Sequence, residues 1–377
     1  MNSFVNRRAN LLRDAKADGS DAFLITEPTN VRYLSGFTGS SALLYLSAKH
    51  SVILSDGRYA QQLEEECPEL EAHIRPQDVS QWADVASFLS IHGPATVAVE
   101  ADHITIALHE HLRANAAGAV LQPLSGRVER LRATKDAGEI QAIREAIAVA
   151  ERAFKMFAAC ITPRHTEIEL ANDMEHFLRQ AGAVKSAFDP IVAIGERSAL
   201  PHAKPTVRPV QDSAKLLVDW GADCGYRSDL TRTLKLPFPI TPTRRSRTER
   251  LGYDFDRIYS AVLAGHDAAV RELRAGALVK DVDGAARAAL TRHSPKGIDL
   301  ATMFTHGLGH GLGLATHEAP FLRQSSDASL EVGHVVTIEP GVYLPGWGGI
   351  RIEDDYLITR DGAIRLTTLP HDPDALA

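Results

Sequence analysis

Four acidic residues and one histidine in the C-terminal half constrain the fold of this chain more than any other feature. In chain order they are Asp219, Asp229, His310, Glu339 and Glu353. If the fold gathers the four carboxylates, they repel one another and are driven to protonate unless a positive charge lies between them. Two divalent cations balance four carboxylates formally. Oxygen ligands with a single imidazole suit Mn²⁺, Co²⁺ or Zn²⁺, and such paired sites are typical of metal-assisted hydrolysis.

The composition indicates a globular protein with two domains. The chain has 377 residues, more than one hydrophobic core usually serves, and 44% of them are hydrophobic. Its net charge of −7 gives no electrostatic reason to expect nucleic acid or an anionic membrane as a partner. Three widely spaced cysteines predict neither a disulfide framework nor a thiolate metal site. Without an apolar N-terminal core or a membrane-length apolar run, we expect a soluble, cytoplasmic protein.

Hydrophobic periodicity predicts an α/β (α+β) chain with a boundary near residues 127–135. In the first domain, residues 1–126, strands are expected at 22–26, 42–46, 51–54 and 96–99, and helices at 59–66, 82–91 and 105–115. In the second, residues 135–377, helices are expected at 136–160, 166–181, 259–273 and 282–293, the second of them opened by a capping box. Residues 237–256, rich in proline and arginine, predict a solvated loop, with a docking patch as the alternative.

Residues 216–233 (LLVDWGADCGYRSDLTRT) predict two strands joined by a tight turn. If residues 223–225 form a three-residue loop with Gly225 in the left-handed position, Asp219 lies directly opposite Asp229. Opposed like charges destabilise a sheet, and a metal ion between them removes the conflict. The alternative is that each aspartate only caps a turn or a helix.

Residues 305–318 (THGLGHGLGLATHE) place His306, His310 and His317 among four glycines. Histidine can ligate a metal, donate a hydrogen bond or move a proton near neutral pH, and glycine allows close approach of a ligand. The alternative, a phosphate-binding loop, requires a preceding strand, a following helix and a suitably placed acidic residue. Neither an HExxH nor a GxSxG motif occurs in the chain.

The two glutamates each follow an apolar stretch of strand-forming residues, so they are expected to be buried. Buried carboxylates need partners. The partner expected from the whole pattern is a metal ion, and the alternative is a salt bridge to Arg351 or Arg232.

These motifs, in this order, closely resemble the pita-bread metallopeptidase family, which contains aminopeptidase P, prolidase and methionine aminopeptidase. The resemblance covers nearly the whole chain and implies two divalent ions, with Mn²⁺ favoured over Zn²⁺ or Co²⁺, and a homodimer. The implied ligands are Asp219, Asp229, His310, Glu339 and Glu353, with Asp229 and Glu353 bridging the two ions. It gives His202, His306 and His317 roles in substrate contact and stabilisation of the tetrahedral intermediate, and matches Arg351 to the family's Gly-Ile-Arg-Ile-Glu-Asp motif. Taken alone, His202 would be an ordinary surface residue.

Residues 30–40 (NVRYLSGFTGS) and 55–59 (SDGRY) resemble the creatinase-like domain that precedes the catalytic half of aminopeptidase P and prolidase. Methionine aminopeptidase lacks that domain, and creatinase lacks the metal ligands. The Asp-Gly-Arg-Tyr sequence is more similar to aminopeptidase P. Prolidases usually have an arginine for the dipeptide carboxylate just after the His-Glu pair, where this chain has residues 320–322 (PFL), with Arg323 nearby.

The predicted function is therefore an Xaa-Pro aminopeptidase that acts on short proline-containing peptides. The alternatives are an Xaa-Pro dipeptidase (prolidase) and a non-catalytic, peptide-binding member of the fold. In the predicted mechanism, a water held between the two ions loses a proton to Glu339 and attacks the carbonyl before proline. The chain departs from the family pattern because its two aspartates are ten residues apart, where eleven is usual.

Overall fold

The computed structural model describes residues 3–93, 95–238 and 253–374. The chain forms two compact units, Met1–Arg132 and Ala133–Ala377. Within the described residues, no helix combines the length and the apolar character that crossing a membrane requires.

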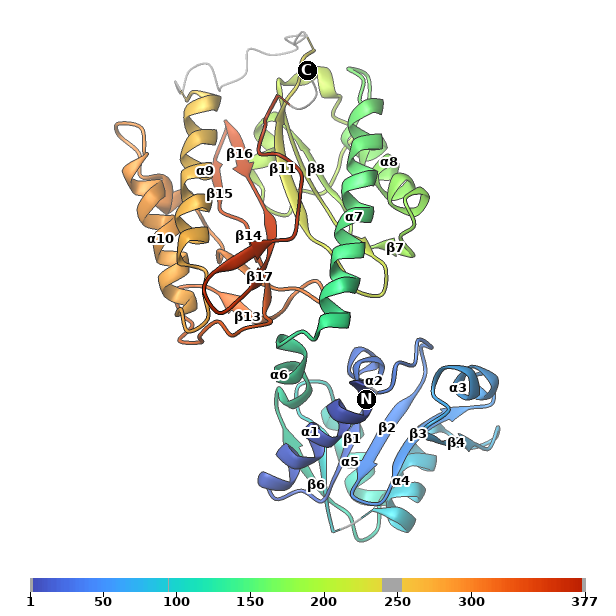
Figure 1. Ribbon diagram of the computed structural model, residues 1–377. Coiled ribbons are helices and arrows are strands. Elements are labelled where there is room, and N and C mark those ends of the chain that lie inside the picture. Colours follow the sequence, from blue (N-terminus) through green and yellow to red (C-terminus); the bar gives the residue numbers. More distant parts are fainter. Residues whose placement is uncertain (1–2, 94, 239–252, 375–377) are drawn as a thin grey trace. The chain divides into compact units, whose positions relative to one another are not determined.

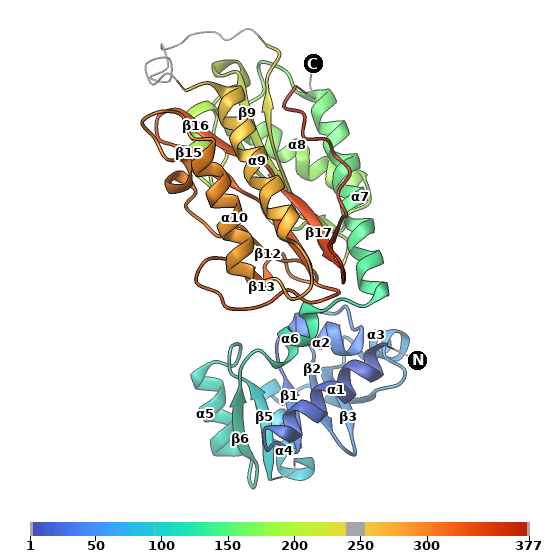
Figure 2. The ribbon, with the colours of Figure 1, turned by 60° about the vertical axis from the view of Figure 1, so that its left-hand side comes forward.

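The first unit is a six-stranded mixed sheet with helices on both faces (Figures 1 and 2). The inner strands pair antiparallel and the outer strands pair parallel to their neighbours. One face packs against α4 (Gln81–His92) and α5 (Ile106–Asn115), and α1 (Ser3–Ala17) covers the other. In sheet order the strands are β4 (Glu71–Arg75), β3 (Ser51–Asp56), β2 (Leu43–Ser47), β1 (Ala22–Ile25), β5 (Thr96–Glu100) and β6 (Val120–Leu124).

The seven elements predicted in this region are confirmed within a few residues, including α3 (Ala60–Glu66). The sequence did not predict α1, α2 (Pro28–Ser35), β4, β6 or α6 (Arg127–Ala133). Strands β4 and β6 lie at the edges of the sheet and are largely exposed, so they lack the apolar alternation that marks a buried strand. Helix α6 lies within residues 127–135, where the sequence predicted only a domain boundary.

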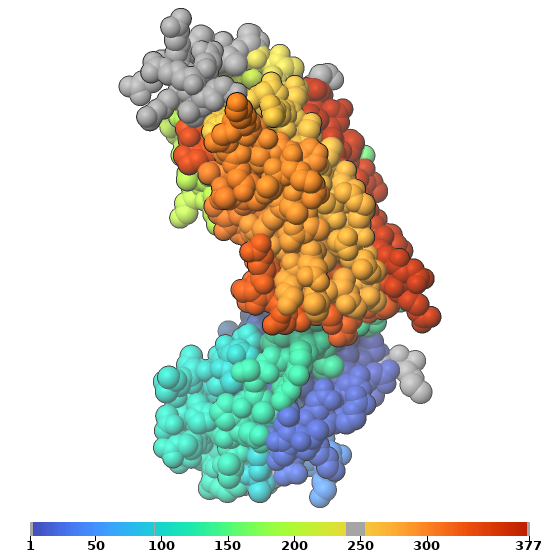
Figure 3. Space-filling view, turned by 90° about the vertical axis from the view of Figure 1, so that its left-hand side faces the viewer, coloured from blue at the N-terminus to red at the C-terminus, as the bar shows by residue number. Residues whose placement is uncertain are grey.

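The second unit contains two layers of β-strands, and each layer is covered by a pair of helices. Helices α7 (Ala137–Cys160) and α8 (Glu167–Gln180), each opened by a capping box, pack on the sheet β11-β9-β8. Helices α9 (Phe255–Glu272) and α10 (Val279–Arg292) pack against the remaining strands and cover one face of the unit (Figure 3). Its strands are β7 (Lys185–Ser186), β8 (Ile191–Ile194), β9 (Lys215–Trp220), β10 (Ala222–Asp223), β11 (Leu230–Lys235), β12 (Gly309–Gly311), β13 (Glu318–Leu322), β14 (Val335–Ile338), β15 (Gly341–Leu344), β16 (Gly348–Arg351), β17 (Asp354–Ile358) and β18 (Ala363–Arg365).

The four helices predicted in this unit are confirmed. Helix α9 begins at Phe255, earlier than predicted, because the Asp254 side chain accepts a hydrogen bond from Arg257 N and caps it. Most of the loop predicted at residues 237–256, including the arginine-rich run, lies outside the described residues.

The hairpin of β9 and β11 forms as predicted, but its predicted register is wrong by two residues. Asp219 pairs with Thr231, and Asp229 is therefore its diagonal neighbour. The cause is the tip of the hairpin: Asp223 bridges Arg227, and Gly225, with a φ of 100°, is the middle residue of the loop. Because side chains alternate with a period of two, this shift leaves both aspartates on the same face of the sheet.

Gly221 is required where the two aspartates approach each other. A Cβ at this position would lie 2.0 Å from Ser228 O and 3.0 Å from the Phe188 ring. We expect Gly221→Ala to destabilise the protein by about 1–3 kcal/mol, because the added methyl overpacks a buried contact. Urea unfolding measures the change. The matched control is Gly362→Ala, where no atom lies within 4 Å of the new Cβ, and equal midpoints for the two variants would contradict the packing argument.

Candidate metal centre

The five predicted ligands lie around one cavity of about 730 Å³ in the second unit. All five are at or near the ends of strands: Asp219 in β9, Asp229 directly before β11, His310 in β12, Glu339 directly after β14 and Glu353 between β16 and β17. Strand ends from three sheets thus bring together residues that are up to 134 positions apart in the chain.

Distances confirm that these side chains converge. His310 Nε2 lies 3.4 Å from Glu339 Oε1 and 3.8 Å from Asp229 Oδ2. One ligand atom from each of Asp229, His310 and Glu353 lies within 4.8 Å of the other two. Because His310 Nδ1 donates to Gly311 O, the lone pair of Nε2 faces the carboxylates, which is the usual arrangement of a ligating histidine.

The electrostatics of this cluster call for a cation. Burial, reinforced by Glu353, raises the pKa of both Asp229 and Glu339 well above its usual range. Burial likewise raises the pKa of Glu353 to about 8. Burial lowers the pKa of His310 to about 3, so this imidazole is neutral, as a ligand must be. The donor set therefore fits a pair of divalent cations that restores the ionised carboxylates.

Arg351 holds the remaining aspartate. Its Nη2 donates to Asp219 Oδ2 at 2.6 Å and its Nε donates to Thr231 Oγ1 at 3.0 Å. Asp219 Oδ1 is buried and has no hydrogen-bond partner among the described residues, which leaves it free for a metal ion. The alternative of a salt bridge from Glu339 or Glu353 to an arginine is not observed in the described part of the chain, because Arg351 pairs with Asp219 and Arg232 with Asp354.

His306 lies beside the ligands with both ring nitrogens engaged. Its Nδ1 lies 2.8 Å from Gly307 O and must donate to it, so Nε2 accepts from the Tyr343 hydroxyl, also at 2.8 Å. Tyr343 in turn accepts from Arg351 Nη1 at 2.8 Å. Burial lowers the pKa of His306 to about 4, which keeps the ring neutral. In this arrangement both ring nitrogens of His306 are engaged within the protein, and the role in stabilising an intermediate that the resemblance implied stays a prediction.

The other two predicted histidines face the cavity. The His317 ring lies 4.3 Å from the His310 ring in an edge-to-face arrangement, and burial lowers the pKa of His317. His202 follows the 3₁₀ turn η1 (Gly195–Ala199), is exposed, and lines the same cavity. Both are thus available to contact a substrate.

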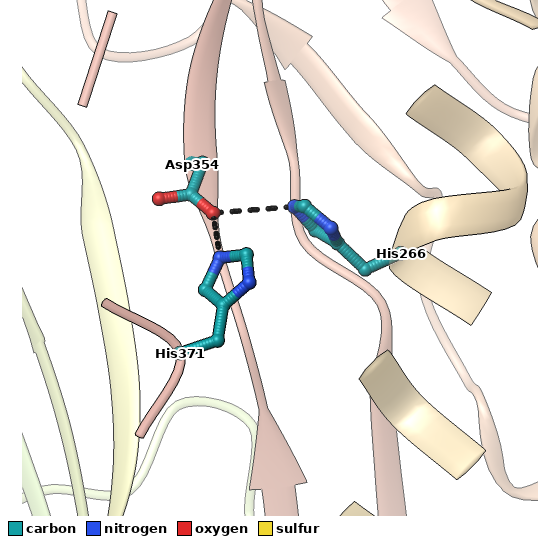
Figure 4. Close-up of side chains that lie close together, drawn as sticks. All are labelled: His266, Asp354 and His371. Carbon is teal, nitrogen blue, oxygen red and sulfur yellow. Dashed lines mark hydrogen bonds and ion pairs between the residues drawn. The ribbon is translucent and has the colours of Figure 1, made fainter. Parts of the chain in front are cut away.

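A second cluster of potential ligands, His266, Asp354 and His371, lies outside this cavity (Figure 4). Asp354 Oδ1 accepts hydrogen bonds from Arg232 Nη2 at 2.8 Å and from Arg365 Nη2 at 2.7 Å. Two guanidinium groups already neutralise this carboxylate and would repel a cation. His371 Nε2 also contacts Asp354 Oδ2 directly, which leaves no room for an ion between them. This cluster is therefore an ion-pair network.

The sequence-based interpretation missed several residues that organise the site. Tyr343 and Thr231 stood within the motifs considered but received no role. Tyr343 hydrogen-bonds to both Arg351 and His306. Thr231 hydrogen-bonds to both Arg351 and Glu353. The signal available for Thr231 was strand alternation, because it lies two residues after Asp229, which directly precedes β11.

A helix-covered two-layer fold around an oxygen-rich donor set with neighbouring imidazoles defines the class of metal-dependent hydrolases. Residues 141–360 match metallopeptidase family M24, and residues 7–134 match the creatinase/prolidase N-terminal domain. The chain therefore belongs to metallopeptidase family M24 and has its pita-bread fold, which confirms the resemblance carried by the motifs.

Relatives that are named for their activity are similar to this chain over more than nine-tenths of its length. The Xaa-Pro dipeptidase of Pyrococcus horikoshii is 31% identical, covering 92% of this chain and 92% of its own. The structure of an Xaa-Pro dipeptidase from Bacillus anthracis has a TM-score of 0.88 and 33% identity, covering 98% of this chain and 99% of its own. The structure of an X-Pro aminopeptidase from Thermotoga maritima MSB8 has a TM-score of 0.83 and 32% identity, covering 96% of this chain and 99% of its own.

Proposed function

We propose that this protein is an Xaa-Pro dipeptidase, a metallopeptidase that hydrolyses the bond before proline in dipeptides. This reverses the preference drawn from the sequence, where the aminopeptidase came first. Among the relatives described above, two are named as dipeptidases and one as an aminopeptidase, and the more similar of the two structures is a dipeptidase.

The observation that carries the proposal is the charge pattern of the cavity. Lys204 and Arg323 line its wall, and neither side chain has an ion-pair partner among the described residues. The Arg323 guanidinium lies 5.8 Å from the Phe321 ring, and both side chains line the cavity. A dipeptide presents its C-terminal carboxylate within one residue of the scissile bond, so unpaired cations that line the same cavity suit this substrate.

The residues have distinct roles in this proposal. Asp219, Asp229, His310, Glu339 and Glu353 would hold two divalent cations. When bound, these cations supply an activated water and polarise the scissile carbonyl. Glu339 accepts the proton of the attacking water and passes it to the prolyl nitrogen as the C–N bond breaks. His317 and His202 donate hydrogen bonds to the carbonyl oxygen as its charge develops, and His306 orients Tyr343 and Arg351.

The prolyl bond explains why a dedicated site is needed. Proline has no backbone N–H, so a protease that grips the scissile amide through that donor fails there. A cavity that holds the two ends of a short peptide through charge does not depend on that N–H group.

A second candidate is the Xaa-Pro aminopeptidase predicted first. The Thermotoga maritima relative favours it, as does Phe321, which stands in the stretch where prolidases usually have an arginine. Incubation of the Mn²⁺-loaded protein with Ala-Pro and with Ala-Pro-Ala separates the two. We expect a higher kcat/KM for Ala-Pro, and efficient cleavage of Ala-Pro-Ala alone would establish the aminopeptidase instead.

The proposed carboxylate contact is tested by Arg323→Gln. We expect KM for Ala-Pro to rise by about tenfold or more, because a charge-assisted hydrogen bond contributes about 1.5–3 kcal/mol. We expect kcat to change little, because Arg323 does not touch the reacting atoms. Steady-state kinetics provides both values. Arg360→Gln, an exposed arginine outside the cavity, is the matched control, and an unchanged KM in Arg323→Gln would remove Arg323 from the substrate site.

A further inference from the structure

The C-terminal segment, residues 367–371, is held against the rest of the second unit by buried polar contacts. Glu151, in the middle of α7, accepts hydrogen bonds from Thr368 N, from Thr368 Oγ1 and from Leu369 N. In Figure 1 this part of the chain runs alongside α7 towards the C-terminus. These contacts hold the segment against α7.

Arg232 connects this segment to the metal centre. It lies on β11, on the opposite face from Asp229 and Thr231, and is 2% exposed. All five of its N–H groups have an acceptor. The acceptors are Pro370 O at 3.1 Å, Leu369 O at 2.9 Å, Asp354 Oδ1 at 2.8 Å, Thr231 O at 2.9 Å and Glu353 O at 2.7 Å.

Asp354 also connects the C-terminal segment to the residues around the metal centre. Its Oδ1 also accepts from Arg365 Nη2 and from Thr367 Oγ1, both at 2.7 Å. Its Oδ2 lies 3.3 Å from His266 Nε2 and contacts His371 Nε2, so the imidazoles of α9 and of the C-terminal segment converge on one carboxylate oxygen (Figure 4). The residue next to the predicted ligand Glu353 is thus the meeting point of three parts of the fold.

Glu353 itself depends on these contacts for its orientation. It stands between β16 and β17, outside a regular ladder. Its N–H donates to Thr231 O at 3.2 Å, its carbonyl accepts from Arg232 Nη1, and its Oε2 accepts from Thr231 Oγ1 at 2.7 Å. Arg232 is therefore the link that fixes the Glu353 peptide group from behind the sheet.

We propose that the C-terminal segment, through Arg232 and Asp354, positions Glu353 for metal binding. Arg232, Asp354 and Glu151 are then positioning residues that never touch the substrate. This inference rests on the proposed function, in which Glu353 holds the cations. It predicts that loosening the segment, even from the distant Glu151, weakens metal binding.

The test is a calorimetric titration of the metal-free, full-length protein with MnCl₂, together with its melting temperature before and after loading. Arg232→Lys keeps the charge but offers three donors to five acceptors. We expect it to weaken Mn²⁺ binding by about tenfold or more, as loss of a group that orients a ligand usually does. Glu151→Gln should weaken binding in the same direction by a smaller factor.

The control is Glu100→Gln in the first unit, which also alters a buried carboxylate that accepts two backbone N–H groups, those of Thr26 and Glu27. Its Mn²⁺ affinity should equal that of the wild type. If Arg232→Lys does not fold, Glu151→Gln decides the question alone, since it changes only the outer end of the connection. Affinities within twofold of the wild type in folded variants overturn the positioning role alone. A wild-type protein that binds no Mn²⁺ overturns the proposed function as well.

Discussion

Glu339→Gln is expected to lower kcat by about 10²- to 10⁴-fold, because a glutamine can neither take a proton from the attacking water nor return it to the prolyl nitrogen. The position of Glu339 beside the other predicted ligands suits it to this role. Its Oε1 lies 3.4 Å from His310 Nε2, and both residues line the cavity, so the carboxylate faces the metal ligands and the space for substrate together. Steady-state kinetics on Ala-Pro measures the loss.

Because Glu339 is also a predicted metal ligand, the variant must be assayed with its metal content known. Elemental analysis of the Mn²⁺-loaded variant, with turnover expressed per loaded molecule, separates loss of the base from loss of metal. Circular dichroism should match the wild type, since the substitution conserves size. Glu331→Gln, an exposed glutamate in the same unit, is the control. Near-normal turnover in the loaded Glu339→Gln protein would remove Glu339 as the base.

The parts of the fold that could be predicted from the sequence are those encoded by neighbouring residues. The Thr166-x-x-Glu169 pattern predicted the start of α8 because both halves of the capping box lie within one turn. The placement of Glu339 and Glu353 at strand ends was likewise a local inference from apolar runs. The convergence of the five ligands was implied by the resemblance to the family. The charge argument added only that carboxylates gathered in this way need a cation between them.

The register of the β9–β11 hairpin could not be predicted from the same rules. The loop length depends on a choice between two adjacent three-residue turns, and both place Gly225 in the loop. The turn that forms is supported by Asp223 Oδ1, which accepts from Gly225 N at 2.9 Å, and by pairing of β10 with β7, some 37 residues earlier. Long-range pairing of this kind leaves no trace in the hairpin's own sequence.

The network around Asp354 was invisible for the same reason. Its partners Arg232, His266 and His371 come from three distant parts of the chain. Arg232 stood in a motif that the sequence analysis considered, but His266 and His371 lie in none. The donor state of His306 also depends on tertiary contacts, with Gly307 O on one side and the Tyr343 hydroxyl on the other. Residue type alone left open whether the ring donates or accepts, and these two contacts make Nδ1 a donor and Nε2 an acceptor.

Removal of metal is expected to make the stability of the protein depend strongly on pH. In the metal-free protein, burial raises the pKa of Glu353 to about 8, above the ordinary value of 4.5 that it regains on unfolding. The folded state therefore binds a proton more tightly than the unfolded state. The stability that this group contributes is present in full below about pH 4.5 and is lost as the pH rises towards 8. The loss is on the order of 4–5 kcal/mol for this one group.

Bound cations should cancel this loss, because they stabilise the ionised carboxylate that burial disfavours, and their binding releases protons. The difference in melting temperature between Mn²⁺-loaded and chelator-treated protein should therefore grow steadily from pH 5.5 to pH 8. Differential scanning calorimetry at several pH values measures it. Glu353→Gln should reduce the pH dependence because glutamine does not titrate, and the buried carboxyls of Asp229 and Glu339 should keep the rest of it. A difference that stays constant across this range in the wild type would mean that Glu353 faces no cation, and the assignment of the metal centre would fail with it.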